Sequence, residues 1–155
     1  MRKFFAVFAL GAILTLASFE QTHAQAFNKG SLIGEAGLAW PGVYGSLEYG
    51  LTDKIGPGRI GVGATLGLPL FSGYFGVYLG PEAYYHFEIP AVRQLDLAAG
   101  LGLYFGLVGG FYVNPSLNFL GRYFFTDKIG IALRANYGFV GGIGVGGGIG
   151  VAFKL

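Results

Sequence analysis

Only a few residues of this 155-residue chain have the type and spacing that chemistry requires. Gly142-x-Gly144-x-x-Gly147 matches the dinucleotide-binding pattern, which needs a helix after the glycines to direct its N-terminus at a pyrophosphate. No helical sequence follows here. His86 stands near Glu82 and Glu88, and a lone histidine of this kind is more often a hydrogen-bonded structural residue than a catalytic base. No set of His, Asp and Glu has the spacing of metal ligands, so the sequence predicts no catalytic residue, cofactor or metal.

Isolated charged residues within apolar segments are the second candidate for chemistry. Charges in a dry interior must be paired and hydrogen-bonded. A paired set could form a stabilising ionic plug or, alternatively, a path for protons or ions. The set that the sequence offers is Glu35, Glu48, Glu82, Arg122 and Arg134.

The composition indicates what kind of fold could hold such a set. Hydrophobic residues make up 53% of the chain and charged residues 12%, with 30 glycines and no cysteine. Soluble domains average about 25% charged residues and about 7% glycine. Abundant aromatic and aliphatic residues exclude disorder, and the lack of cysteine excludes a disulfide scaffold. A formal net charge of +2 without a basic stripe gives no reason to expect nucleic-acid binding.

The first residues have the pattern of a secretory signal peptide. Arg2 and Lys3 precede the apolar run 4–16, and Thr22-His23-Ala24 ends on a small residue. The run is shorter than the roughly 20 residues that a spanning helix needs. We therefore expect a signal peptide at 1–24, with cleavage after Ala26 nearly as suitable, and a single domain at 25–155.

The periodicity of the remaining chain favours strands over helices. In 143–155 the odd positions are mostly large and apolar, while glycine fills most even positions. Only a strand sorts a period of two onto opposite faces, and each interior glycine would cost a helix about 1 kcal/mol. Turn residues separate eight such runs, which are 31–40, 43–51, 59–69, 74–88, 95–108, 111–125, 129–140 and 143–155.

These runs predict an all-β fold, an eight-stranded antiparallel up-and-down transmembrane β-barrel with short loops. Strands of about 9–11 residues cross a bilayer obliquely, and they do so only in a closed barrel because unpaired backbone groups are costly in hydrocarbon. Alternation directs aliphatic residues outward and polar ones inward, as in transmembrane barrels. The five charged residues named above then meet inside at similar depth, which favours the plug over the ion path.

The aromatic residues divide between the two faces. Several outward-facing ones near strand ends suit an interfacial girdle. The inward-facing tyrosines Tyr74, Tyr78, Tyr84 and Tyr104 could fill the space left by a wall of inward glycines; otherwise a small lumen remains.

The signal peptide, the alternating strands and the terminal segment 150–155 resemble the small bacterial outer-membrane β-barrels of the OmpA/OmpX kind. The resemblance implies a location in the bacterial outer membrane, with the lipid bilayer as partner. It also implies an insertion signal that the outer-membrane insertion machinery recognises, formed by Gly150, Phe153 and Leu155. A terminal leucine replaces the family's usual aromatic residue, and the short outward loops leave little surface for adhesion.

Together these features predict a non-enzymatic outer-membrane barrel with a structural or interaction role, for example within a larger outer-membrane protein assembly. The main alternative is a narrow channel for water, protons or small solutes. A lipid-modifying barrel enzyme and a secreted glycine-rich polypeptide are less favoured. The lipid-modifying enzymes among the small barrels that this chain resembles pair a histidine with a serine or an acid near the outer leaflet. Here His86 is followed by Phe87, and it falls near the inner end of its strand.

Overall fold

The computed structural model describes residues 26–155 except 41, 71–75 and 140–144, and this part of the chain forms eight strands. The strands are β1 (Leu32–Ala39), β2 (Gly42–Gly50), β3 (Gly58–Pro69), β4 (Gly76–Phe87), β5 (Leu95–Val108), β6 (Phe111–Phe124), β7 (Ile129–Gly138) and β8 (Val145–Lys154). The expected signal peptide at 1–24 lies outside the described residues. Within those residues, no helix has the length and apolar character to span a membrane.

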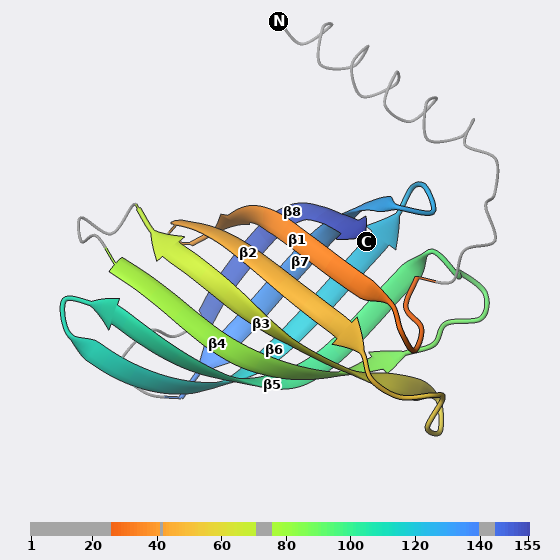
Figure 1. Ribbon diagram of the computed structural model, residues 1–155, viewed down its shortest axis with the longest axis horizontal. Coiled ribbons are helices and arrows are strands. Elements are labelled where there is room, and N and C mark those ends of the chain that lie inside the picture. Colours follow the sequence, from red (N-terminus) through yellow and green to blue (C-terminus); the bar gives the residue numbers. More distant parts are fainter. Residues whose placement is uncertain (1–25, 41, 71–75, 140–144) are drawn as a thin grey trace, which may run out of the picture.

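Each strand pairs antiparallel with the next along the chain, and β1 pairs with β8, so the sheet closes into a barrel. Figure 1 shows the strands running obliquely around the barrel. At the β5–β6 turn, Gly109 and Gly110 have φ of 66° and 155°, a backbone that residues with side chains rarely adopt. The all-β fold and the up-and-down topology predicted from alternation are confirmed, with strand ends within two residues of the predicted runs.

Alternation along the strands gives the barrel an apolar outer wall. Leu101, Phe119 and Leu133 are 62%, 55% and 57% exposed, although each lies well inside its strand. Pairs of aromatic rings stand near strand ends, and they are Tyr85 with Phe87, Tyr123 with Phe125, and Tyr137 with Phe139. An apolar wall bounded by aromatic residues is the lipid-facing surface of a transmembrane barrel.

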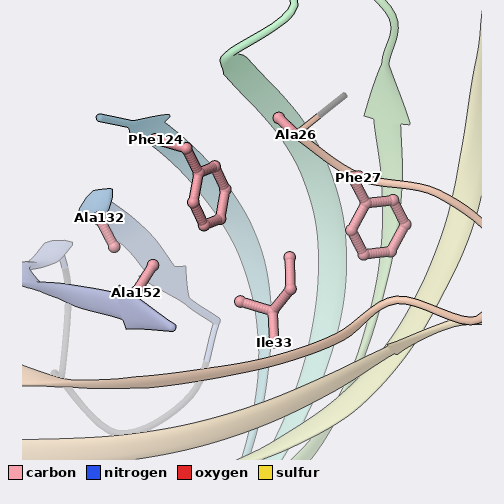
Figure 2. Packing of buried hydrophobic residues seen from close by; sticks show 6 residues of the cluster. All are labelled: Ala26, Phe27, Ile33, Phe124, Ala132 and Ala152. Carbon is pink, nitrogen blue, oxygen red and sulfur yellow. The ribbon is translucent and has the colours of Figure 1, made fainter. Parts of the chain in front are cut away.

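The interior begins with an apolar layer at the end of the barrel where β1 starts and β8 ends. Figure 2 shows the cluster that forms it, consisting of Ala26, Phe27, Ile33, Phe124, Ala132 and Ala152. Four of these side chains come from strands, whereas Ala26 and Phe27 enter from the segment before β1. The Ala26 backbone N–H donates to the Arg93 carbonyl oxygen over 2.8 Å, which fixes this segment. The expectation of polar inward residues was therefore wrong for this layer, where carbon packs against carbon.

Tyrosine rings lie over inward-facing glycines, both beside Glu82 and farther toward the opposite end of the barrel. A Cβ at these glycines would stand 2.0–2.7 Å from ring atoms, in the pairs Tyr84 over Gly100, Tyr78 over Gly67 and Tyr104 over Gly80. Glycine is needed here because any side chain would displace a ring. The rings thus occupy much of the space that the glycines leave; Tyr74 lies outside the described residues.

Gly100→Ala is expected to destabilise the barrel by about 1–3 kcal/mol. Its methyl group would stand 2.1 Å from the Ala83 backbone oxygen, and backbone cannot yield as a flexible side chain can. Gly147→Ala is the matched control, because its Cβ would meet only the Arg134 carbonyl oxygen at an ordinary 3.6 Å. Urea unfolding in phospholipid vesicles measures both, and equal losses of stability would contradict the close packing around Gly100.

Candidate functional site

Arg122 on β6 is the centre of the first half of a buried ionic network. Its Nε donates to Glu35 Oε1 over 2.6 Å and its Nη1 to Asp96 Oδ2 over 3.1 Å. Its Nη2 contacts Glu35 Oε1 at 2.5 Å and also donates to Glu48 Oε2. The guanidinium side chain is 0% exposed, so three carboxylates from β1, β2 and β5 replace its entire hydration shell.

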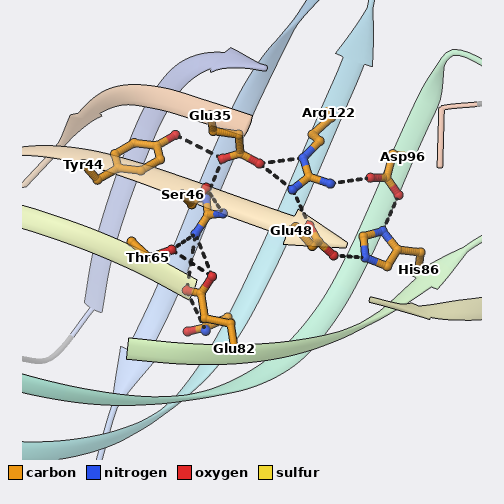
Figure 3. Close-up of polar contacts among 11 residues, drawn as sticks. Glu35, Tyr44, Ser46, Glu48, Thr65, Glu82, His86, Asp96 and Arg122 are labelled. Carbon is orange, nitrogen blue, oxygen red and sulfur yellow. Dashed lines mark hydrogen bonds and ion pairs between the residues drawn. The ribbon is translucent and has the colours of Figure 1, made fainter. Parts of the chain in front are cut away.

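Arg134 on β7 is the centre of the second half. Its Nε donates to Glu35 Oε2 over 2.6 Å, so Glu35 bridges the two arginines. Its Nη1 donates to Thr65 Oγ1 over 2.9 Å and approaches Glu82 Oε2 at 3.2 Å, while its Nη2 donates to Ser46 Oγ over 2.8 Å. All three guanidinium nitrogens are therefore bonded. Figure 3 shows the acidic side chains of this network converging inside the barrel.

His86 on β4 joins the Arg122 half of the network. Its Nδ1 lies 2.7 Å from Asp96 Oδ1 and its Nε2 lies 2.5 Å from Glu48 Oε1 (Figure 3). An ionised carboxylate only accepts hydrogen bonds, so both ring nitrogens must carry protons while both acids are ionised. Phe27 stacks on the imidazole ring, with 3.6 Å between centroids and 9° between planes. The Phe27 ring thus covers one face of the imidazole at this side of the network.

Hydroxyl and amide groups surround Glu82 at the other side of the network. Thr65 donates its hydroxyl to Glu82 Oε2 over 2.8 Å, and the Tyr104 hydroxyl donates to Glu82 Oε1. Asn118 Nδ2 then donates to Tyr104 Oη over 3.1 Å. Such a network is stabilising only when its members are satisfied, and each charged member here has at least one oppositely charged partner.

The structure brings the sequence-predicted charged residues into contact within one network, which consists of Glu35, Glu48, Glu82, Arg122 and Arg134. Sequence reasoning missed Asp96 and His86 as members. It related His86 to Glu82 and Glu88, whereas the ring contacts Glu48 and Asp96. A signal for Asp96 was present, because it faces inward and is the direct cross-strand partner of Arg122.

A cavity lies on each side of the network. The one beyond Arg134 has a volume of about 240 Å³ and is lined mainly by tyrosine, asparagine and glycine. The other, about 300 Å³, reaches His86 and Asp96 and is lined by Arg59, Arg93 and Glu88 at the rim. Glu88 pairs there with Lys54 at 2.7 Å. Among the described residues, no three His, Cys, Asp or Glu side chains are grouped to hold a metal ion.

The residues of the expected insertion signal lie on the last strand and at its end. Phe153 and Leu155 are 39% and 77% exposed. Gly150 faces inward, where a Cβ would stand 2.6 Å from the Tyr44 hydroxyl oxygen, so packing already requires glycine at this position. Recognition of these residues during insertion stays a prediction.

Comparison with known proteins finds similarity in structure. No family model and no curated protein matches the sequence. The N-terminal β-barrel domain of Pseudomonas aeruginosa OprF matches with a TM-score of 0.69 and 20% identity, covering 83% of this chain and 100% of that domain. The Yersinia pestis outer membrane protein Ail matches with a TM-score of 0.56 and 12% identity, covering 82% of this chain and 100% of that one.

These similarities confirm the predicted fold class. The chain has the eight-stranded barrel fold of small outer-membrane proteins. That fold, together with the apolar outer wall and the buried salt-bridge network, makes it an outer-membrane β-barrel protein whose immediate surroundings are the lipid bilayer.

Proposed function

We propose that this barrel is a closed, non-enzymatic structural protein of the outer membrane, which acts through its outer wall and rims. The observation that carries this proposal is the Arg122–Glu35–Arg134 chain across the lumen. Glu35 and both arginines come from three strands, β1, β6 and β7, and the acids they bind extend the network to β2, β4 and β5. An eight-stranded barrel is narrow enough for such side chains to fill.

The same geometry argues against a proton path, the main alternative. In the hydrogen-bond network described above, the connection from His86 to Glu82 runs through Arg122, Glu35 and Arg134. A guanidinium has no acceptor atom and keeps its protons. It can therefore bind an acid on either side without passing a proton between them. The two arginines therefore support an interior that blocks protons rather than one that conducts them.

Planar-bilayer recording tests the closed barrel. We expect no discrete conductance steps from the wild-type protein under conditions in which a sixteen-stranded porin conducts. Arg134→Ala is the informative variant, because it removes one layer of the network and leaves the Arg122 layer in place. Conductance gained only by this variant would place the barrier at Arg134 and support the plug, whereas steps from the wild type would contradict the proposal.

We further propose that the chain is exported by a cleaved signal peptide at 1–24 and inserted by the outer-membrane machinery through Gly150, Phe153 and Leu155. Exposure of Phe153 and Leu155 supports recognition by another protein. Once inserted, the apolar wall would be the surface through which the barrel joins a larger outer-membrane assembly. Phe153→Ala should reduce the amount of folded barrel in the outer membrane. Phe105→Ala, on β5, is the control, because Phe105 is 40% exposed and Phe153 is 39% exposed. Equal amounts of folded barrel from the two variants would contradict an insertion signal that includes Phe153.

A further inference from the structure

The cavity beyond Arg134 has no role in the closed barrel proposed above. It has a volume of about 240 Å³ and lies between the Arg134 layer and the end of the barrel formed by Ala39 and Pro69. Tyr78 and Tyr84 stand in one part of its wall, and the bare backbone of Gly146 stands in another. At about 30 Å³ for each water molecule, it would hold about eight of them.

Several polar groups of this wall lack a protein partner. Tyr84 is only 3% exposed and lines the cavity, and its hydroxyl makes no hydrogen bond to any described residue. The same holds, within the described part of the chain, for the hydroxyls of Tyr78 and Tyr112 and the carboxamide of Asn136. A buried tyrosine hydroxyl usually has a partner. These groups line the cavity and are available to an occupant that both donates and accepts hydrogen bonds.

The described wall of the cavity has no charged group that is free to bind a ligand. Arg134 is the charged residue among the described residues that line the cavity, and its Nε, Nη1 and Nη2 are bonded to Glu35, Thr65 and Ser46. An anionic ligand would have to displace these bonds, and a cationic one would meet the guanidinium. The occupant that fits is neutral.

We propose that the cavity binds a neutral monosaccharide. A sugar ring has apolar C–H faces, which the tyrosine rings can cover, and hydroxyl groups at its edges, which tyrosine hydroxyls and Asn136 can bond. Drug-sized ligands occupy about 300–1,000 Å³, so a cavity of about 240 Å³ suits a single ring. This inference does not depend on whether the lumen conducts.

Fluorescence of Trp40 provides the test, because Trp40 lines the cavity and is the one tryptophan of the chain. The barrel, refolded in a detergent without a sugar headgroup, is titrated with glucose, gluconate and glucosamine. We expect a saturable change with glucose and at least a tenfold weaker response to the two charged compounds. Saturation-transfer NMR from protein to glucose is the second measurement.

Tyr84→Phe removes one hydroxyl and leaves the ring in place, so it should weaken glucose binding about five- to tenfold. Tyr137→Phe makes the same change on the outer wall and should leave binding within twofold. No saturable binding by either measurement would overturn the proposal and mean that the cavity holds water only. Binding that survives Tyr84→Phe, or that prefers a charged sugar, would overturn it as well.

Discussion

Arg122→Leu is expected to lower the free energy of unfolding of the barrel by about 3–5 kcal/mol, the usual cost of removing one partner from a buried ion pair. The substitution leaves the carboxylates of Glu35, Glu48 and Asp96 without the cation that they share. Arg122→Lys should recover only part of this loss, because an ammonium group cannot reproduce the planar set of donors that reaches three acids.

Urea unfolding in phospholipid vesicles measures the effect. A double variant, Arg122→Leu with Glu48→Gln, removes one of the three acids that have lost Arg122 and should regain part of the stability lost by the single variant. Lys29→Ala is the control, because Lys29 pairs with Asp53 at 2.5 Å on the surface and such exposed pairs contribute little. A midpoint for Arg122→Leu as high as that of Lys29→Ala would contradict a stabilising ionic core.

Leu101→Arg should destabilise the barrel in vesicles by about 2–4 kcal/mol, as for a charge facing lipid at mid-depth. Leu101 is 62% exposed and lies at the middle of β5. Leu107→Arg, near the end of the same strand and 58% exposed, should cost only about 0–1 kcal/mol because its charge can reach the interface. Were the wall to face water, both substitutions would be neutral, and equal small effects would contradict the membrane account.

The strands and their inward and outward faces could be predicted because a period of two is a local property of the sequence. Whole strands such as β5 and β6 were predicted with ends within two residues. Local patterns do not specify partners across the lumen, which depend on how far each strand is staggered in the closed barrel. His86 therefore faces Asp96 on the adjacent strand and Glu48 on β2 rather than its near neighbours in sequence.

The apolar layer was missed for a related reason. Ile33 and Phe124 occupy inward positions, yet their residue types suit a lipid-facing wall equally well. Phe27 precedes the first strand and has no periodicity to place it, although it stacks on His86. The interior is thus ordered along the axis into apolar, ionic and tyrosine-lined layers, an order set by tertiary packing.

The most direct test of the central claim, that one face of each strand contacts lipid and the other a filled interior, is a nitroxide scan in vesicles of the positions in 97–106 that are not glycine. The chain has no cysteine, so each single-cysteine variant carries one label. We expect odd-numbered positions to collide with oxygen dissolved in the bilayer, most strongly near Leu101, and even-numbered positions to be shielded from oxygen and from a water-soluble nickel chelate. Odd-numbered positions open to the nickel chelate, or a period of 3.6 residues, would contradict the account.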